Sequence, residues 1–178
     1  GFQNKTLISY IGGMAKSQIP YSFFKALKLI TSRGFDAILR FSGKIHQDAI
    51  TEINNLSLQK QIECEGYVGH NTAIRNMVNS DFLLLVIPNT NNNRGIITGK
   101  IFEYIRSETT IICIGPANSD AAKIIRDTHS GFIFDYDDSN GISELIMSPK
   151  SVTSVDFDKY SRKNLANQLC SIFSDLTL

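Results

Sequence analysis

The stretch Gly95-Ile96-Ile97-Thr98-Gly99-Lys100-Ile101-Phe102-Glu103-Tyr104 decides the fold of this chain, because it joins two wholly apolar runs. Phe82–Ile87 precedes it, followed by a polar loop over residues 88–94, and Thr110–Ile114 comes after it. Short apolar runs bounded by turn residues are typical of strands buried on both faces of a sheet. We therefore expect two parallel strands joined by a short helix that begins at Thr98-Gly99-Lys100.

The start of this helix predicts an anion site. A helix N-terminus presents unpaired backbone N–H groups and the positive end of the helix dipole. Gly99 lets a ligand approach the backbone closely, and Lys100 adds a full positive charge. Glu103 lies one turn further on, where a carboxylate can accept two hydrogen bonds from a sugar diol. The residues favour a diphosphate site with a ribose contact behind it, and simple helix capping by Gly99 and Lys100 is the alternative.

This motif is not a P-loop. The P-loop pattern requires two glycines five residues apart, followed by Lys and then Ser or Thr. Here Gly95 and Gly99 are four residues apart, and Ile101 follows Lys100.

The rest of the chain alternates strands with helices. Further strands are expected at residues 6–11, 35–41, 61–65 and 131–134, with helices at about 20–33, 47–55, 71–78, 118–128 and 141–147. This alternation predicts an α/β fold with a doubly wound, Rossmann-like parallel sheet of about six strands and helices on both faces. The length supports a single domain over residues 1–178.

Glycines follow the expected strands at one edge of this sheet. They stand in Gly12-Gly13, Ser42-Gly43, Gly66-Tyr67 and the stretch from Gly95 to Gly99. Ligands of doubly wound folds bind beyond the carboxyl ends of the strands. The four glycine-bearing loops therefore predict a nucleotide-type ligand at this edge.

A last helix is expected from about Phe157 to Asp175. One of its faces carries five apolar residues at helical spacing, namely Leu165, Leu169, Ile172, Phe173 and Leu176. We expect this face to pack on the sheet or on a neighbouring domain.

Composition and spacing exclude several classes of function. A net charge of +1 gives no electrostatic footprint for nucleic acid, and no apolar run approaches the ~20 residues that span a bilayer. Cys64, Cys113 and Cys170 lack metal-ligand spacing, and we expect reduced cysteines in a cytosolic protein, with Cys64 and Cys113 buried in strands. Asp135-Tyr136-Asp137 imitates a metal-binding pair, but capping of the next helix is the preferred interpretation. The three histidines are expected to be surface or capping residues.

Several segments together resemble the C-terminal, donor-binding domain of GT-B glycosyltransferases of the group-1 (GT4-like) kind. The most specific is Gly99-Lys100-Ile101-Phe102-Glu103-Tyr104-Ile105, and the others are the segments 8–13, 66–68, 111–116 and 131–133, in the same order. The likeness covers nearly the whole chain.

The resemblance implies a role for each loop. Thr98, Gly99 and Lys100 would hold the nucleotide diphosphate together with Gly12 and Gly13, and Glu103 would bind the ribose. Tyr67 and Val68 would contact the base through backbone groups, and Arg94 and Gly95 would lie on the donor-sugar side.

Two positions depart from the family pattern. The family carries a glutamate eight residues before Glu103, where this chain has Gly95, and many relatives carry Arg where Gly13 stands. Lys16, Lys44, Arg94 or Lys100 is expected to compensate for the missing arginine. The catalytic residues are not identified.

The expected function is donor binding in a retaining hexosyltransferase. Such an enzyme moves a sugar from a UDP- or GDP-sugar to a glycan or lipid-linked acceptor in polysaccharide synthesis, and uses no metal and no cofactor. The expected partner is an N-terminal acceptor-binding domain of the same parent chain, which is absent here, so the fragment alone is expected to be inactive. The parent is expected in the cytoplasm, at the inner face of the membrane. The alternatives are a non-catalytic nucleotide-binding module and half of a UDP-sugar 2-epimerase.

Overall fold

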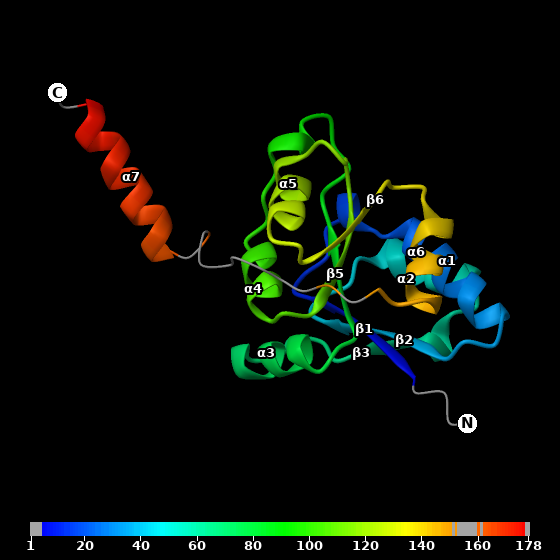
Figure 1. The fold of residues 1–178 in the computed structure, drawn as a ribbon. Helices are drawn as coiled ribbons and strands as arrows, with labels where there is room; N and C mark the ends of the chain where they lie inside the picture. Colours follow the sequence, from blue (N-terminus) through cyan, green and yellow to red (C-terminus); the bar gives the residue numbers. More distant parts are fainter. Residues whose placement is uncertain (1–4, 151, 153–159, 161, 177–178) are drawn as a thin grey trace.

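One parallel sheet organises the molecule. The computed structural model describes residues 5–150, 152, 160 and 162–176 of the 178-residue chain. Within these residues, six strands lie in the order β3-β2-β1-β4-β5-β6, and every neighbouring pair is parallel (Figure 1). The strands are β1 Thr6–Ile11, β2 Ala37–Ser42, β3 Ile62–Cys64, β4 Phe82–Val86, β5 Thr110–Ile114 and β6 Gly131–Phe134. The prediction of a six-stranded, doubly wound sheet is confirmed.

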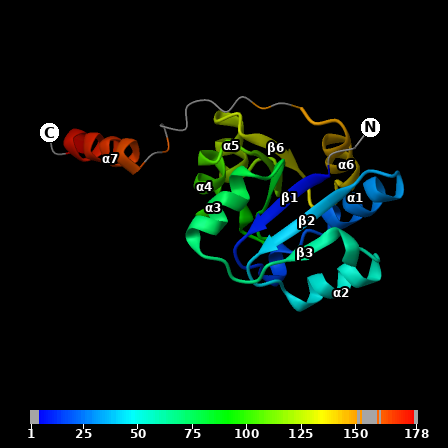
Figure 2. The same cartoon turned by 90° about the horizontal axis from the view of Figure 1, so that it is seen from below.

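Helices cover both faces of the sheet. The first face carries α1 (Tyr21–Ser32), α2 (Gln47–Asn55) and α6 (Ser139–Met147), and the second carries α3 (His70–Val78), α4 (Lys100–Arg106) and α5 (Asp120–Asp127) (Figures 1 and 2). Short 3-10 turns add η1 (Lys16–Gln18), η2 (Gln59–Gln61) and η3 (Asn93–Gly95). Two hydrophobic cores result, one on each side of the sheet.

The central strands explain why this sequence forms a sheet with two covered faces. All five residues of β4 are buried, with Phe82, Leu84 and Val86 in the first core and Leu83 and Leu85 in the second. Successive side chains of a strand point to opposite faces, so a continuous apolar run fills both cores at once.

β1 and β4 separate toward their carboxyl ends. Their register covers only Ile8 with Phe82 and Ser9 with Leu83, whereas β1 pairs with β2 over six positions. In the gap beyond, the buried Tyr104 hydroxyl of α4 accepts a hydrogen bond from the Ile11 amide at 2.9 Å and donates to the Leu84 carbonyl at 3.5 Å. Between these two strands the chain changes direction across the sheet, and such a switch point is the usual ligand crevice of an open α/β sheet.

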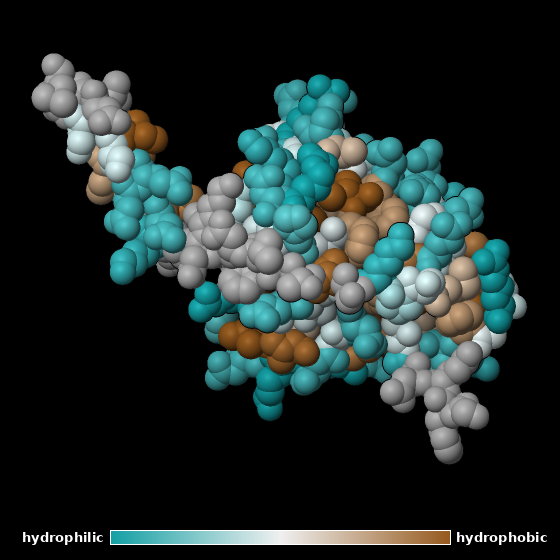
Figure 3. Space-filling model, in the orientation of Figure 1, coloured by the Kyte–Doolittle hydropathy of each residue, from teal (hydrophilic) through white to brown (hydrophobic). Residues whose placement is uncertain are grey.

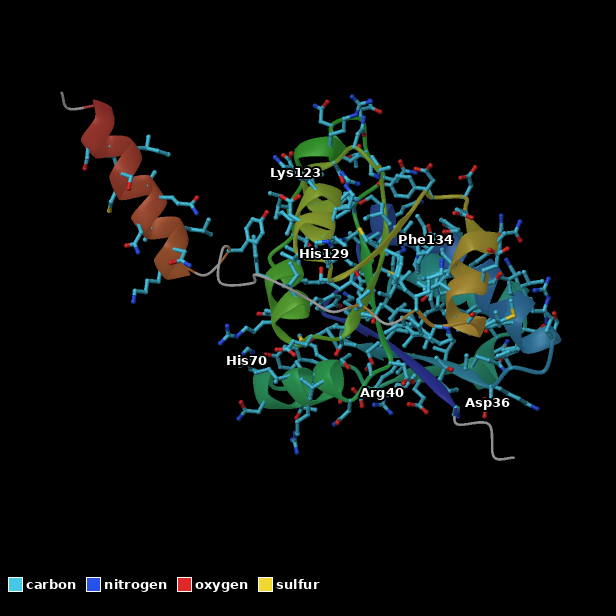
Figure 4. All side chains as sticks on the ribbon, viewed as in Figure 1. Asp36, Arg40, His70, Lys123, His129 and Phe134 are labelled. Carbon is cyan, nitrogen blue, oxygen red and sulfur yellow. The ribbon has the colours of Figure 1, made fainter. Side chains whose placement is uncertain are left out.

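Among the places where apolar side chains are exposed on the face shown in Figure 3, two belong to the elements around the sheet. One place is α3, where Ile74 and Val78 are 42% and 52% exposed. The other is a hollow of about 510 Å³ between the edge strand β6 and α6, where Phe134 lies (Figure 4). The hollow lies at the edge of the sheet, away from the crevice between β1 and β4.

The last helix departs from the sequence prediction. Helix α7 spans Arg162–Leu176 and projects away from the sheet (Figures 1 and 2), with Leu165, Leu169, Ile172 and Phe173 each at least 40% exposed. The expectation that this face packs on the sheet is therefore wrong. Packing on a neighbouring domain stays a prediction. Phe157 and the side chain of Leu176 lie outside the described residues.

Of the smaller sequence predictions, some are confirmed and one is wrong. Asp138 caps α6 by accepting from the Gly141 amide at 2.8 Å, and His46 caps α2 through Nδ1, so the capping interpretations of both regions are confirmed. Cys113 is buried, but Cys64 is exposed because it ends the short edge strand β3. In the described part of the chain, no helix is long and apolar enough to cross a membrane.

Candidate functional site

Lys100 lies at the crevice between β1 and β4. Its ammonium is 3.4 Å from the Gly13 carbonyl oxygen and 4.2 Å from the centre of the Tyr10 ring, over the ring face. The Tyr10 hydroxyl in turn donates to the same Gly13 carbonyl at 3.3 Å. Burial lowers the pKa of Lys100 to about 8. The first residue of α4 thus places a partly desolvated positive charge against the loop that follows β1.

The glycines of the β1 and β2 loops make this approach possible. Gly12 has φ of +93°, and a Cβ there would come within 2.9 Å of the Lys100 Cε. A Cβ on Gly43 would collide with the Gly12 backbone. No atom lies within 4 Å of the place of a Cβ on Gly13, so its surroundings are open to a ligand. Only glycines let the two loops and the lysine stand this close together.

A hollow of about 560 Å³ opens beside this loop, at the carboxyl ends of β1, β2 and β3. Its lining includes Gly12, Gly13, Lys44, Tyr67 and Val68. The Tyr67 side chain is 94% exposed, while Val68 packs against the second hydrophobic core. The volume lies within the range of small-molecule sites, and glycine-rich walls leave backbone groups accessible.

A polar network fixes the wall of this hollow. One oxygen of Glu65, which follows β3, accepts from the Ser42 hydroxyl at 2.7 Å and from the Asn76 amide of α3 at 2.6 Å. The other oxygen lies 3.6 Å from Nε of Arg40, which Figure 4 shows on β2. The backbone carbonyl of Ser42 accepts from the Gly12 amide at 2.7 Å. The exits of β1, β2 and β3 are therefore tied to one another and to α3.

The start of α4 offers further polar groups. The Thr98 hydroxyl is shielded from solvent and has no hydrogen-bond partner among the described residues. A Cβ on Gly99 would meet no atom within 4 Å, so the backbone there is open. Glu103 is exposed and three residues after Lys100, which puts both side chains on one side of the helix. Helix α4 has only seven residues, so Lys100 rather than the helix dipole supplies most of the positive charge.

A second, more polar hollow of about 600 Å³ lies beyond β4 and β5. It is lined by asparagine amides from residues 91–93, by Arg94 and Gly95, and by Pro116 and Asn118 from the next loop. The loop is held at both ends, because the Asn89 amide donates to the Ser17 carbonyl at 2.8 Å and Asn93 donates to the Tyr136 hydroxyl at 3.0 Å. Tyr136 donates in turn to the Ile87 carbonyl at 2.9 Å.

The structure therefore brings the residues singled out from the sequence to one edge of the sheet. Gly12, Gly13, Tyr67 and Val68 share the first hollow, with Lys100 against the same loop. Arg94 and Gly95 line the second hollow instead. Lys16 does not join them, because its ammonium is paired with Asp48 at 2.9 Å on the surface. Within the described ranges, no group of three or more His, Cys, Asp or Glu residues could hold a metal ion.

Sequence reasoning missed the residues that support these loops. Tyr10, Tyr104 and the network of Ser42, Glu65 and Asn76 are joined by contacts between residues 11 to 93 positions apart. Such pairs follow no short motif. The available signals were a buried Tyr next to Gly12-Gly13 and a Ser at the end of β2.

Comparison with known proteins finds likeness in structure alone. No protein-family model and no curated protein sequence matches the chain. The C-terminal domain of the group-1 glycosyltransferase LpcC from Francisella tularensis matches with TM-score 0.58 and 17% identity, over 80% of this chain and 76% of that one.

Two longer glycosyltransferase chains match as well. WaaG, from lipopolysaccharide biosynthesis, has TM-score 0.64 at 14% identity, over 83% of this chain and 39% of its own. HepE from Anabaena, solved with UDP-glucose, has TM-score 0.63 at 13% identity, over 82% of this chain and 39% of its own. The chain thus spans about two fifths of these proteins. At these identities the likeness concerns the fold alone, and this chain shares that fold with the matching parts of these glycosyltransferases.

Proposed function

We propose that this chain binds the nucleoside diphosphate part of a sugar donor, as one half of a glycosyltransferase. The observation that carries the proposal is the Lys100 ammonium held against Gly13 at the crevice between β1 and β4, beside the glycine-lined hollow. The likeness of the fold to glycosyltransferase domains, one of them solved with UDP-glucose, supports the same assignment.

Each part of the donor has a matching group. The diphosphate would lie on the backbone of Gly12 and Gly13 and against Lys100 and the Thr98 hydroxyl. The base would enter the first hollow beside Tyr67 and Val68, and Glu103 would accept hydrogen bonds from the ribose hydroxyls. These assignments account for an open Gly13, an unpartnered Thr98 hydroxyl and an exposed Glu103.

The charge of Lys100 has a chemical purpose in this proposal. When the bond between sugar and diphosphate breaks, negative charge develops on the leaving diphosphate. A cation held ready in a partly desolvated site stabilises that charge without reorganising during the step. Lys100 would therefore serve in place of a metal ion, and no cofactor is needed.

The remainder of the proposal concerns the whole enzyme. The acceptor would bind to an N-terminal domain of the parent chain, and transfer of a hexosyl group with retention would occur between the two domains in the cytoplasm, at the inner face of the membrane. Catalysis needs donor and acceptor held in near-attack geometry. The present chain alone should bind nucleotide weakly and transfer no sugar.

Calorimetry with a ligand series tests the proposal. UDP or GDP should bind more tightly than the monophosphate, and the free nucleoside should bind most weakly. The affinity should fall with added salt, because charge attraction is screened. It should be the same in EDTA and in Mg²⁺. Equal binding of the nucleoside and its diphosphate, or binding that requires Mg²⁺, would contradict it.

Transfer measured on the parent chain separates the proposal from its rivals. A non-catalytic module would bind nucleotide without turnover in the full-length protein. A 2-epimerase would convert the donor sugar without any acceptor. Net transfer of sugar to an acceptor by the full-length protein, and none by this chain, is the result that we expect.

A further inference from the structure

The outer side of β6 carries backbone groups that are free to bind another strand. β6 is the last strand of the sheet, and its one paired side faces β5 (Figure 1). The carbonyls of Ser130 and Phe134 accept from amides of β5 and of the residue after it, both at 2.9 Å. Since successive residues of a strand direct their backbone groups to opposite sides, those of Gly131 and Ile133 point outward. Among the described residues, no hydrogen bond engages the amide of either.

The sequence of β6 does not protect this edge. Edge strands of soluble proteins are usually guarded by charged side chains, by proline or by a bulge. The opposite edge strand, β3, carries Glu63 among its three residues. β6 reads Gly131-Phe132-Ile133-Phe134, without a charge or a proline, and all four residues are half-buried. Its register with β5 is regular, so no bulge turns the edge away. A further strand can therefore add here.

The apolar hollow beside β6 would receive the side chains of such a strand. It has a volume of about 510 Å³ and lies between β6 and α6. Phe132 and Phe134 line it from the strand, and Leu145 and Met147 line it from the helix. Figure 4 shows Phe134 at this place. A strand added to β6 continues the sheet on the face that bears the hollow, so its apolar side chains would cover it.

Two opposite charges indicate what the added strand belongs to. Glu144 of α6 and Lys150, which follows the helix, both line the hollow and are exposed. Among the described residues, neither side chain forms an ion pair. Under twofold symmetry a contact between two different residues occurs twice, once in each direction. Glu144 of each copy can therefore face Lys150 of the other. This self-complementarity favours a second copy of the chain over an unrelated strand.

We propose that two copies of this chain associate by antiparallel pairing of their β6 strands about a twofold axis at Ile133. The outward amide and carbonyl of Ile133 would bond to those of the same residue in the other copy, and Gly131 would lie opposite Asp135. Phe132 and Phe134 of each copy would cover the hollow of the other. The two sheets would become one, and the edge that β6 now exposes would be paired.

The dimer would leave the nucleotide crevice free. The crevice lies between β1 and β4, inside the sheet, and β6 is separated from β4 by β5. Antiparallel pairing turns the carboxyl ends of the strands in opposite directions in the two copies, so the two crevices would open on opposite sides of the dimer. The inference is therefore independent of the proposed function, and the affinity for UDP should not change on dimerisation.

Sedimentation velocity over a concentration series, combined with amide hydrogen exchange, tests the inference. A dimer should form in the micromolar to millimolar range. The amide of Ile133 should exchange more slowly as the dimer forms, because it is then hydrogen-bonded. A chain that stays monomeric up to about 1 mM would overturn the inference. So would a dimer in which exchange at Ile133 is the same as in the monomer.

A change in the backbone of β6 tests the pairing directly. Ile133→Pro removes the outward amide at the centre of the interface and keeps the bonds of β6 to β5, since proline is tolerated on an edge strand where its nitrogen faces outward. This variant should be monomeric. Ile133→Val keeps the amide and a similar side chain, and should form the dimer as the wild type does.

Surface charges give a second test that leaves the strand intact. Glu144→Lys places like charges opposite each other and should weaken the dimer by about tenfold, counting two exposed pairs. Adding Lys150→Glu to it should restore the dimer by exchanging the charges. Lys123→Glu, at an exposed position on α5, is the matched control and should have no effect. These variants decide the question even where Ile133→Pro does not fold.

The exposed stripe of α7 is the rival interface. Leu169 is 51% exposed on that helix, and Leu169→Glu should leave the proposed dimer unchanged. A dimer that Leu169→Glu breaks and that Glu144→Lys leaves intact would overturn the pairing through β6. UDP titrated into wild type and Glu144→Lys should bind equally to both, so the outcome for the dimer and the outcome for the nucleotide site are read separately.

Discussion

Removing the Lys100 ammonium should weaken nucleoside diphosphate binding by about thirtyfold. A hydrogen bond to a charged group contributes about 1.5–3 kcal/mol, and 1.4 kcal/mol corresponds to a factor of ten in the dissociation constant. A loss of about 2 kcal/mol on Lys100→Ala is expected, because the ammonium already stands partly desolvated against Gly13 and the Tyr10 ring. Binding of the ligand therefore adds little to the desolvation cost of this ammonium.

The same lysine should make binding depend on pH. Burial holds the pKa of Lys100 in the free protein at about 8, and a bound diphosphate raises it by stabilising the charged form. Below pH 8 the lysine is already protonated, so its contribution is constant. Above pH 8 binding must be accompanied by proton uptake, and the affinity should fall as the pH rises from 8 to 9.5. Lys100→Ala should show no such fall.

Calorimetry of UDP and uridine at pH 7.0, 8.0 and 9.0 measures both effects. Lys28→Ala, at an exposed position on α1, is the matched control and should behave as the wild type. Uridine affinity should be nearly equal in all three proteins, since uridine has no phosphate. A folded Lys100→Ala protein that binds UDP as tightly as the control would refute the reasoning. So would an affinity for UDP that rises above pH 8.

Four further outcomes are expected. Glu103→Ala should weaken UDP binding by about 1.5–3 kcal/mol with little change in Tm, and an unchanged affinity would remove the ribose contact. Tyr104→Phe leaves a buried backbone N–H without its acceptor and should cost about 1–3 kcal/mol of unfolding free energy, measured in denaturant; no loss would contradict the bridge between β1 and β4. Glu65→Ala should weaken uridine and UDP by the same factor, because it loosens the base hollow and leaves the diphosphate groups in place, and a selective effect on UDP would argue against this. The unfolding free energy should rise by about 2 kcal/mol between pH 7.5 and 9.5, since the folded pKa of Lys100 lies below its unfolded value near 10.5 and the unfolded state binds more protons in that window. Lys100→Met should abolish the rise.

The sheet could be predicted from the sequence because its determinants are local. The apolar run at Phe82–Val86 fills both cores by alternation alone, and glycines follow the strands where the loops must turn. The order of the strands was not predicted, and only the structure gives it.

The contacts that hold the site residues in place could not be predicted from the sequence in this way. The contact between Lys100 and Gly13 joins positions 87 residues apart, and that between Tyr104 and Ile11 joins positions 93 apart. The sequence predicts Lys100 as an anion-binding residue from its place at a helix start. In the structure its ammonium lies against the loop after β1. Only the folded chain shows why Gly12 must lack a side chain.

Helix α7 shows a second limit of prediction from the sequence, in which a local signal is present but the surface it packs on is not known. Its apolar stripe is a genuine periodic signal, yet periodicity says that a face needs covering and not what covers it. In the structure the stripe is exposed, so the prediction of packing on the sheet failed while the prediction of a helix held.

The most direct test of the central assignment is a titration of the isotopically labelled chain with UDP and GDP, followed by backbone amide NMR. The account predicts saturable shifts at Gly12, Gly13, Tyr67, Val68 and Lys100, at least one nucleotide binding in the micromolar to millimolar range, and no shifts at the apolar hollow between β6 and α6. The absence of shifts with both nucleotides at millimolar concentration would contradict the account, as would shifts confined to residues outside the crevice between β1 and β4.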